Sequence, residues 1–187
     1  MGEARVKGTV IIPSVEYIKN KYGESTFQKV VSRTSPASQK VLNGRILASS
    51  WYDVDVIVEY LTAAEALLKG KDPHIVDNLG KASADYAARG VYKVFLMVTS
   101  PTKVIHMSPH IWAKYYSFGK MEIVENSDGS ATLHLVDSDF SSEILCRRIR
   151  GWMERVIELT GGKNPAVKHT KCQSRGADYE EYIAKWD

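Results

Sequence analysis

The chain has 187 residues, of which 44% are apolar and 25% charged, and 25 basic against 22 acidic side chains give a net charge of +3. This length predicts one domain with a sizeable core, and so balanced a charge gives no support for nucleic-acid binding. The two cysteines, Cys146 and Cys172, cannot build a disulfide framework or a metal site by themselves. We expect two reduced thiols in a cytoplasmic protein. No run of about 18 apolar residues occurs, so no membrane span is predicted.

Residues 1–118 are expected to be mainly helical, because apolar residues recur there at intervals of three or four. Start signals such as Asp53, and glycines after the last apolar position, define the boundaries. Residues 46–52 are less easily assigned. The apolar run 91–98 allows a buried helix or a buried strand, and its flanking helices and the Ser100-Pro101 stop favour a helix. The predicted helices span residues 13–23, 25–33, 35–43, 54–69, 72–90 and 108–119.

From residue 119 onward the apolar period changes from about 3.6 to 2. Apolar positions alternate on both sides of Asp128-Gly129, and this arrangement is a strong hairpin signal. A long amphipathic helix then runs from Ser141 to Gly161. A second predicted hairpin, over residues 167–186, completes the chain.

Helices and hairpins without a βαβ alternation predict an α+β fold. We expect an N-terminal helical layer packed on a C-terminal four-stranded antiparallel sheet, with one long helix between the two hairpins. The chain then forms a single domain over residues 1–187. Residues 1–118 are its mainly helical part, and residues 119–187 are its hairpin–helix–hairpin part.

Two pairs of residues have a spacing that could suit a metal ion. His106 and His110 are four residues apart, but Pro109 lies between them and no third ligand is evident, so ordinary polar or capping histidines are favoured. His169 and Cys172 are three apart in a predicted strand, so their side chains should face opposite sides. No metal site is therefore predicted. The usual catalytic and nucleotide-binding motifs are also missing, and we assign no catalytic residue.

The long helix is rich in arginine, and the helices before it are rich in aromatic residues. The arginines could bind an acidic ligand or partner, although the solvated face of an amphipathic helix is the favoured interpretation. The aromatic residues could line an apolar pocket or belong to the core. The arginines are Arg147, Arg148, Arg150 and Arg155. The candidate ligand-binding residues are Trp51, Tyr52, Trp112, Tyr115 and Tyr116.

The C-terminal segment resembles the close of the vinyl-reductase-type ligand-binding domains, through residues 172–178 followed by Tyr182 and Trp186. That superfamily shares its α+β fold with bacterial haem/nitric-oxide-binding domains and with Bet-type subunits of vesicle transport particles. Further short motifs are similar to an uncharacterised family of about this length, best known from myxobacteria. These motifs are Lys7-Gly8, residues 48–52, Ser100-Pro101, Ile111-Trp112 with Tyr116 and Gly119, and Cys146 with Gly151-Trp152.

The chain departs from these relatives at two places. Vinyl-reductase-type domains often carry a second cysteine two residues before the aromatic that Tyr182 matches, and Glu180 stands there instead. The resemblance therefore does not predict a paired-cysteine metal or redox site. The haem-binding relatives use a proximal histidine and a Tyr-x-Ser-x-Arg clamp. Residues 115–119 lack the arginine, and His106 is too close to them, so we expect no haem and no other cofactor.

The resemblance implies a non-enzymatic sensor or regulatory domain that binds a small apolar molecule or lipid between the helical layer and the sheet. The alternative is a structural protein–protein interaction module that acts as a dimer, as the transport-particle relatives do. An enzyme acting on porphyrin-like substrates is the least favoured reading. A homodimer or a regulatory protein partner is expected, and nucleic acid is not.

Overall fold

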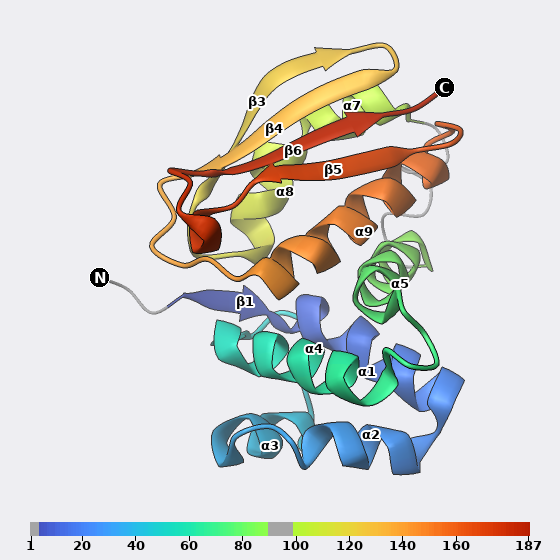
Figure 1. The fold of residues 1–187 in the computed structure, drawn as a ribbon, viewed down its shortest axis with the longest axis vertical. Helices are drawn as coiled ribbons and strands as arrows, with labels where there is room; N and C mark the ends of the chain where they lie inside the picture. Colours follow the sequence, from blue (N-terminus) through green and yellow to red (C-terminus); the bar gives the residue numbers. More distant parts are fainter. Residues whose placement is uncertain (1–3, 90–98) are drawn as a thin grey trace.

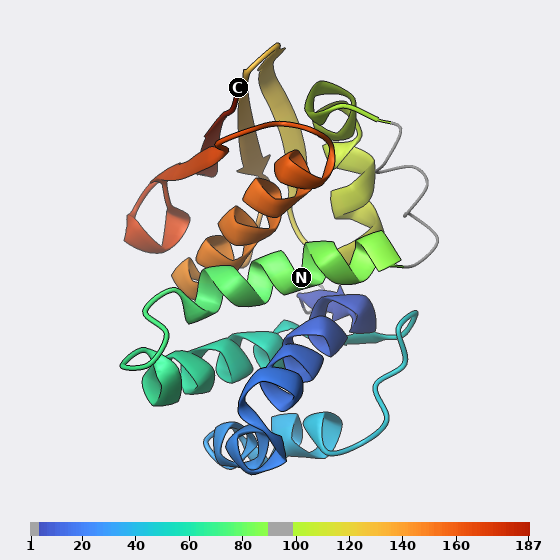
Figure 2. The same ribbon diagram turned by 90° about the vertical axis from the view of Figure 1, so that its right-hand side faces the viewer.

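The computed structural model describes residues 4–89 and 99–187 and confirms the predicted α+β class. Figures 1 and 2 show the elements stacked in layers, with the four-stranded sheet at one end and two short helices, α2 (Glu24–Val31) and α3 (Pro36–Leu42), at the other. Helix α9 (Glu143–Leu159) lies against the sheet. Helix α5 (Ile75–Arg89) lies between α9 and two N-terminal helices, α1 (Gly8–Tyr22) and α4 (Val54–Leu68). No helix in the described ranges is both long and apolar enough to cross a membrane.

The N-terminal half contains a small sheet that the sequence patterns did not predict. Its two strands pair antiparallel, with Val6 opposite Tyr52. Each has only three residues, too few to show an alternating pattern. The elements of this half are β1 (Arg5–Lys7), α1 (Gly8–Tyr22), α2 (Glu24–Val31), α3 (Pro36–Leu42), β2 (Trp51–Asp53), α4 (Val54–Leu68) and α5 (Ile75–Arg89).

Local cap signals locate some helix starts and miss others. The side chain of Asp53 accepts a hydrogen bond from the Asp55 backbone N–H, which confirms the predicted start of α4. Helix α1 begins at Gly8, five residues before the predicted start at Pro13. The proline therefore lies inside the helix rather than at its first position. Asp72 Oδ1 accepts from the His74 backbone N–H at 3.2 Å, so Asp72 caps the turn that leads into α5, which begins at Ile75. Its buried carboxylate also accepts from the Tyr22 hydroxyl at 2.8 Å and ties the end of α1 to the loop before α5.

The C-terminal half confirms the predicted hairpin–helix–hairpin order. Its four strands form an antiparallel sheet in the order β3-β4-β6-β5, and Gly129 occupies the first turn with φ 84°. The elements are α7 (Pro101–His106), α8 (Ser108–Tyr115), β3 (Lys120–Ser127), β4 (Ser130–Val136), α9 (Glu143–Leu159), β5 (Ala166–Lys171), the 3-10 turn η1 (Gln173–Arg175) and β6 (Glu180–Lys185).

The Ser100-Pro101 pair starts a helix instead of stopping one. The Ser100 side chain accepts from the Lys103 backbone N–H, and Pro101 is the first residue of α7, which is a favoured place for proline. Helix α8 ends at Tyr115, four residues before the predicted Gly119. The helix predicted over 91–98 lies outside the described residues.

One face of the sheet is covered by α7, α8 and α9. Strand β4 alternates strictly, so that Leu133 and Leu135 are buried, and in β6 the buried positions are Glu180, Tyr182 and Ala184. A carboxylate therefore stands on the core-facing side of the sheet. This position makes Glu180 a candidate for a functional role.

Helices α5 and α9 cross so closely that their backbones touch, as Figure 2 illustrates. A methyl group added at Gly80 would lie 2.0 Å from the backbone oxygen of Arg148. A methyl group at Gly151 would lie 2.2 Å from the backbone oxygen of Asp77. Only glycine permits this approach at either position. The crossing brings Arg150 within reach of Asp77, to which its Nε donates at 2.9 Å.

Candidate functional site

A cavity of about 230 Å³ lies between α1, α5, α8, α9 and the start of β3. Its lining is largely apolar and aromatic, as is usual for small-molecule pockets. Each of these elements contributes at least one side chain, so the cavity forms only when the two halves of the chain pack together. The described residues that line it are Thr9, Val10, Ser83, Tyr86, Ala87, Ser108, Ile111, Trp112, Tyr115, Tyr116, Met121, Arg148, Ile149, Trp152 and Met153.

Trp112 is the best-fixed of the aromatic lining residues. Its ring stacks on Tyr116 with the ring centres 4.0 Å apart, and the edge of Phe118 faces both rings. The indole Nε1–H donates to the Phe118 backbone oxygen at 2.7 Å, which satisfies the buried polar atom of the ring. This wall of the cavity is therefore held in place by ring packing and a hydrogen bond within the protein.

The structure brings together three of the five candidate ligand-binding residues. Trp112, Tyr115 and Tyr116 all line the cavity. Trp51 and Tyr52 lie in β2, outside it. Trp51 is 40% exposed with the Lys7 ammonium 4.1 Å from the centre of its ring, and the Tyr52 hydroxyl accepts from the Leu47 backbone N–H. Trp51 and Tyr52 thus support the small sheet rather than this cavity.

Pattern reasoning missed the contribution of α9, above all that of Arg148. This side chain is only 2% exposed, so the solvated-face interpretation is wrong for it. Its position three residues after Leu145 and four before Trp152 places it on the apolar stripe of the helix, and this spacing was a usable signal. The other three arginines are half-buried and pair with carboxylates of α4, α5 or α9 itself.

Among the residues that the structure describes, Arg148 makes its hydrogen bonds to neutral groups alone. Its Nη2 donates to the Val10 backbone oxygen at 2.7 Å and to Ser83 Oγ at 2.6 Å, and its Nη1 lies 3.5 Å from the Tyr116 hydroxyl. Burial lowers the pKa of Arg148, an effect that Tyr116 partly offsets. The guanidinium nevertheless stays protonated at neutral pH, because its pKa starts so high. Burial also raises the pKa of Tyr116, which keeps that hydroxyl neutral.

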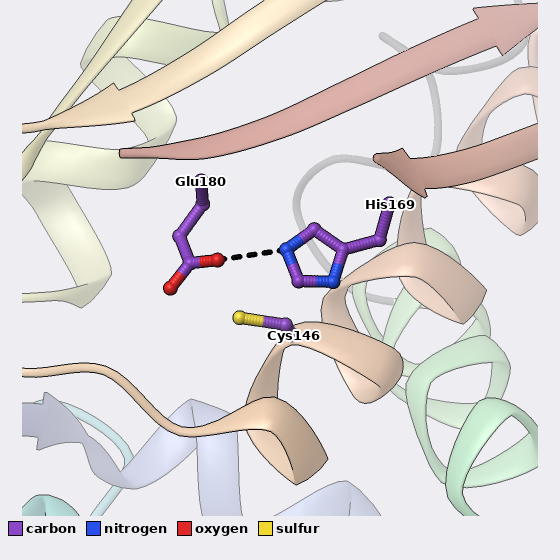
Figure 3. Close-up of side chains that lie close together, drawn as sticks. All are labelled: Cys146, His169 and Glu180. Carbon is purple, nitrogen blue, oxygen red and sulfur yellow. Dashed lines mark hydrogen bonds and ion pairs between the residues drawn. The ribbon is translucent and has the colours of Figure 1, made fainter. Parts of the chain in front are cut away.

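A second cluster joins α9 to the sheet. Cys146 from α9, His169 from β5 and Glu180 from β6 converge, and their ligand atoms all lie within 4.8 Å of one another (Figure 3). His169 Nε2 is 2.7 Å from one Glu180 oxygen, and Ser141 Oγ donates to the other at 2.6 Å. A thiol, an imidazole and a carboxylate form a donor set that Zn²⁺ accepts.

Burial raises the pKa of Cys146, so this thiol is protonated at neutral pH unless a metal binds. Burial also acts to raise the pKa of Glu180. Hydrogen bonds from His169 and Ser141 outweigh that effect, and the pKa of Glu180 ends below its usual value. The cluster therefore holds a carboxylate ready for a cation, next to a thiol that a metal would have to deprotonate.

The pairs considered from the sequence alone do not form this cluster. His106 and His110 are both exposed. The expectation that His169 and Cys172 face opposite sides assumed an unbroken strand, but the register shifts between His169 and Lys171. As a result Cys172 is buried as well, and it is near enough to Cys146 to raise the pKa of that thiol further. Sequence spacing could not show that three separate elements meet here.

No family model matches the chain, and no curated protein matches it either. Solved structures share its fold. The H-NOX protein from K. algicida, in the unliganded Fe(II) state, has a TM-score of 0.72 at 12% identity and covers 97% of this chain and 96% of its own. The H-NOX protein from S. oneidensis in the Fe(II)NO state has a TM-score of 0.72 at 14% identity, covering 97% and 99%.

The likeness to H-NOX proteins confirms the predicted fold shared with haem/nitric-oxide-binding domains. At such low identity it shows the fold alone. Membership of the vinyl-reductase-type superfamily, or of the myxobacterial family, stays a prediction.

Haem is the cofactor to compare with this cavity, because one of the similar solved structures concerns haem distortion in the H-NOX family. The residues of this chain do not fit it. All five histidines of the sequence lie in the described ranges, and none of them lines the cavity. A cavity of about 150 Å³ takes up benzene, so by proportion 230 Å³ holds a molecule of about ten non-hydrogen atoms. A porphyrin is far larger.

Proposed function

We propose that this chain is a non-enzymatic sensor or regulatory domain that binds a small apolar molecule or lipid in the cavity lined by Trp112, Tyr116 and Trp152. The cavity itself is the observation that carries the proposal. Its size favours a small molecule over a lipid.

The position of the cavity supports a regulatory role. It lies at the junction of α5 from the N-terminal half with α8 and α9 from the C-terminal half. A ligand there touches both halves, so its binding free energy stabilises their packing. The likeness to H-NOX proteins, one of them solved with NO on its iron, adds support from the fold.

A cavity-filling substitution tests the proposal. Ala87→Phe places a ring in the cavity, whereas Ala113→Phe adds the same ring on the exposed side of α8. We expect native mass spectrometry of gently purified wild-type protein to show a co-purified mass. That mass should be absent from A87F and present in A113F. A wild-type protein with no bound mass, and with no thermal shift from small apolar compounds, would contradict the proposal.

The Cys146–His169–Glu180 cluster supports a second candidate property, a structural Zn²⁺ that fastens α9 to the sheet. Three protein donors from three elements would close a loop between them, and metal binding would then add to the free energy of folding. Cys172 is buried nearby, but its thiol contacts Ser174 Oγ and is not among the converging ligand atoms, so a local shift would be needed before it could serve as a fourth ligand.

Metal analysis tests this second candidate. Protein produced with added zinc should carry about one Zn²⁺ per chain, and His169→Asn should lose it. The matched control is His134→Asn, because His134 forms the same kind of pair with Glu181, at 2.8 Å, among residues outside the cluster. Equal and substoichiometric zinc in all three proteins would exclude a specific site.

The dimeric interaction module remains the alternative function. Four large apolar side chains in the described ranges are at least 40% exposed, and two of them, Leu47 and Trp51, are close in sequence. A chain that stays monomeric at high concentration would count against the dimer. It would leave the ligand-binding proposal standing.

A further inference from the structure

The cavity contains one charged side chain among its described lining residues, Arg148, and it has no carboxylate partner. No Asp or Glu in residues 4–89 and 99–187 pairs with it, whereas the other three arginines of α9 all do pair with carboxylates. Burial of a charge is costly unless an opposite charge and hydrogen bonds compensate for it. The buried charge of Arg148 at the cavity wall is therefore uncompensated, and a bound ligand could supply the opposite charge.

Unpaired donors concentrate at the same place. Eight buried side-chain polar atoms of the described residues have no hydrogen-bond partner, and three of them belong to residues that line this one cavity. They are Arg148 Nε, Thr9 Oγ1 and Ser108 Oγ. Each can donate a proton to an acceptor. Thr9 is next to Val10, whose backbone oxygen already holds the guanidinium.

We propose that the ligand of this cavity is a small carboxylic acid, whose carboxylate pairs with Arg148 and whose apolar body lies against Trp112 and Trp152. The inference rests on the proposed function and narrows it to one chemical class. A carboxylate supplies the missing countercharge and accepts the free Nε–H in the same contact. The volume of the cavity limits the whole acid, its carboxylate included, to about ten non-hydrogen atoms.

Other occupants match the lining less well. A phosphate ester carries close to two negative charges, and the described lining offers one cation. A neutral apolar molecule would leave the guanidinium buried without a countercharge. Water could accept from Nε, but it cannot compensate for the charge.

Isothermal titration of the purified chain with paired acids and amides tests the inference. The probes are 3-phenylpropanoate against 3-phenylpropanamide, and heptanoate against heptanamide, since each pair has one skeleton and differs in charge. We expect each acid to bind the wild-type protein at least about tenfold more tightly than its amide. In Arg148→Met the affinities of acid and amide should become equal.

Arg147→Met is the matched control. Arg147 is the neighbouring residue of α9, but it points away from the cavity lining and pairs with Glu65 at 2.6 Å. The preference for the acid should be unchanged in R147M. In ligand-free R148M, removal of the buried charge stabilises the fold, whereas loss of the hydrogen bonds to Val10 and Ser83 destabilises it, so we expect only a small change in the melting temperature. A loss of binding in R148M would then not be due to unfolding.

Two results would overturn the inference and separate it from the proposed function. Equal affinity for acids and amides, or an acid preference that survives in R148M, would rule out a carboxylate that pairs with Arg148. The proposal of an apolar ligand in the cavity would still stand. If none of the four probes binds, and no mass co-purifies with the wild-type protein, both the carboxylate inference and the proposed function are wrong.

Discussion

Replacing Gly80 with alanine is expected to destabilise the protein by about 3 kcal/mol. In an ordinary helix the same change would stabilise the helix by about 0.5–1 kcal/mol. The reason is the crossing of α5 and α9. The added methyl would stand 2.0 Å from the backbone oxygen of Arg148 and 2.8 Å from the backbone nitrogen of Trp152. Backbone atoms cannot turn aside as a flexible side chain can, so the two helices must separate. For a chain of this length we expect the melting temperature to fall by about 6–12 °C.

Gly70→Ala is the control for this experiment. Nothing lies within 4 Å of the position that its added methyl would take. It should be neutral or slightly stabilising. Gly151→Ala should resemble Gly80→Ala, and the double variant should cost less than the sum, because the first methyl has already moved the helices apart. Gly80→Ala variants as stable as the wild type would show that α5 and α9 are not in backbone contact.

The same crossing determines the shape of the cavity. Ser83 and Ala87 reach the cavity from α5, and Arg148 and Trp152 reach it from α9. A shift of α5 away from α9 would stretch the hydrogen bond between Ser83 and Arg148. Ligand binding and helix packing are therefore coupled through the crossing, and a ligand should partly restore the stability that Gly80→Ala loses.

Sequence patterns predicted the elements that rest on local chemistry. Asp53 capped its helix as expected, the Asp128-Gly129 turn joined its two strands, and the long helix before the last hairpin was found. Each of these signals lies within a few neighbouring residues. The three-residue strands β1 and β2 were missed, because their stability comes from each other and from packing.

The candidate site was predicted only in part, because it depends on contacts that are distant in the sequence. Trp112 and Tyr116 were found as aromatic residues on a helix, and their cavity could not be seen without α5 and α9. His169 and Cys172 were separated by assuming regular alternation, which the shifted register of β5 removes. Arg148 could have been found from its helical spacing, but composition alone suggested a solvated face.

Replacing Glu180 with alanine is expected to destabilise the protein by about 3 kcal/mol at neutral pH. The carboxylate is 1% exposed and accepts from His169 Nε2 and Ser141 Oγ. Its removal leaves both groups without a partner in the core, and each unsatisfied buried group costs about 1–3 kcal/mol. Glu181→Ala is the matched control, because Glu181 pairs with His134, Thr170 and Lys171 from the neighbouring position, and its side chain is 14% exposed, so water can reach the partners left behind. We expect about 1 kcal/mol or less there.

The pH dependence of this loss identifies its cause. The folded-state pKa of Glu180 lies below its ordinary value of 4.5, since hydrogen bonds from His169 and Ser141 outweigh the effect of burial. A lowered folded pKa means that the ionised carboxylate stabilises the fold fully above the unfolded pKa, and that this stabilisation is lost as pH falls through the folded pKa. Urea unfolding should therefore show a difference in unfolding free energy between wild type and Glu180→Ala that is largest at neutral pH and decreases below about pH 4.

If this difference in unfolding free energy stays constant down to acidic pH, the loss is due to packing alone. If a metal chelator decreases the difference at neutral pH, Glu180 instead stabilises the protein through a bound metal.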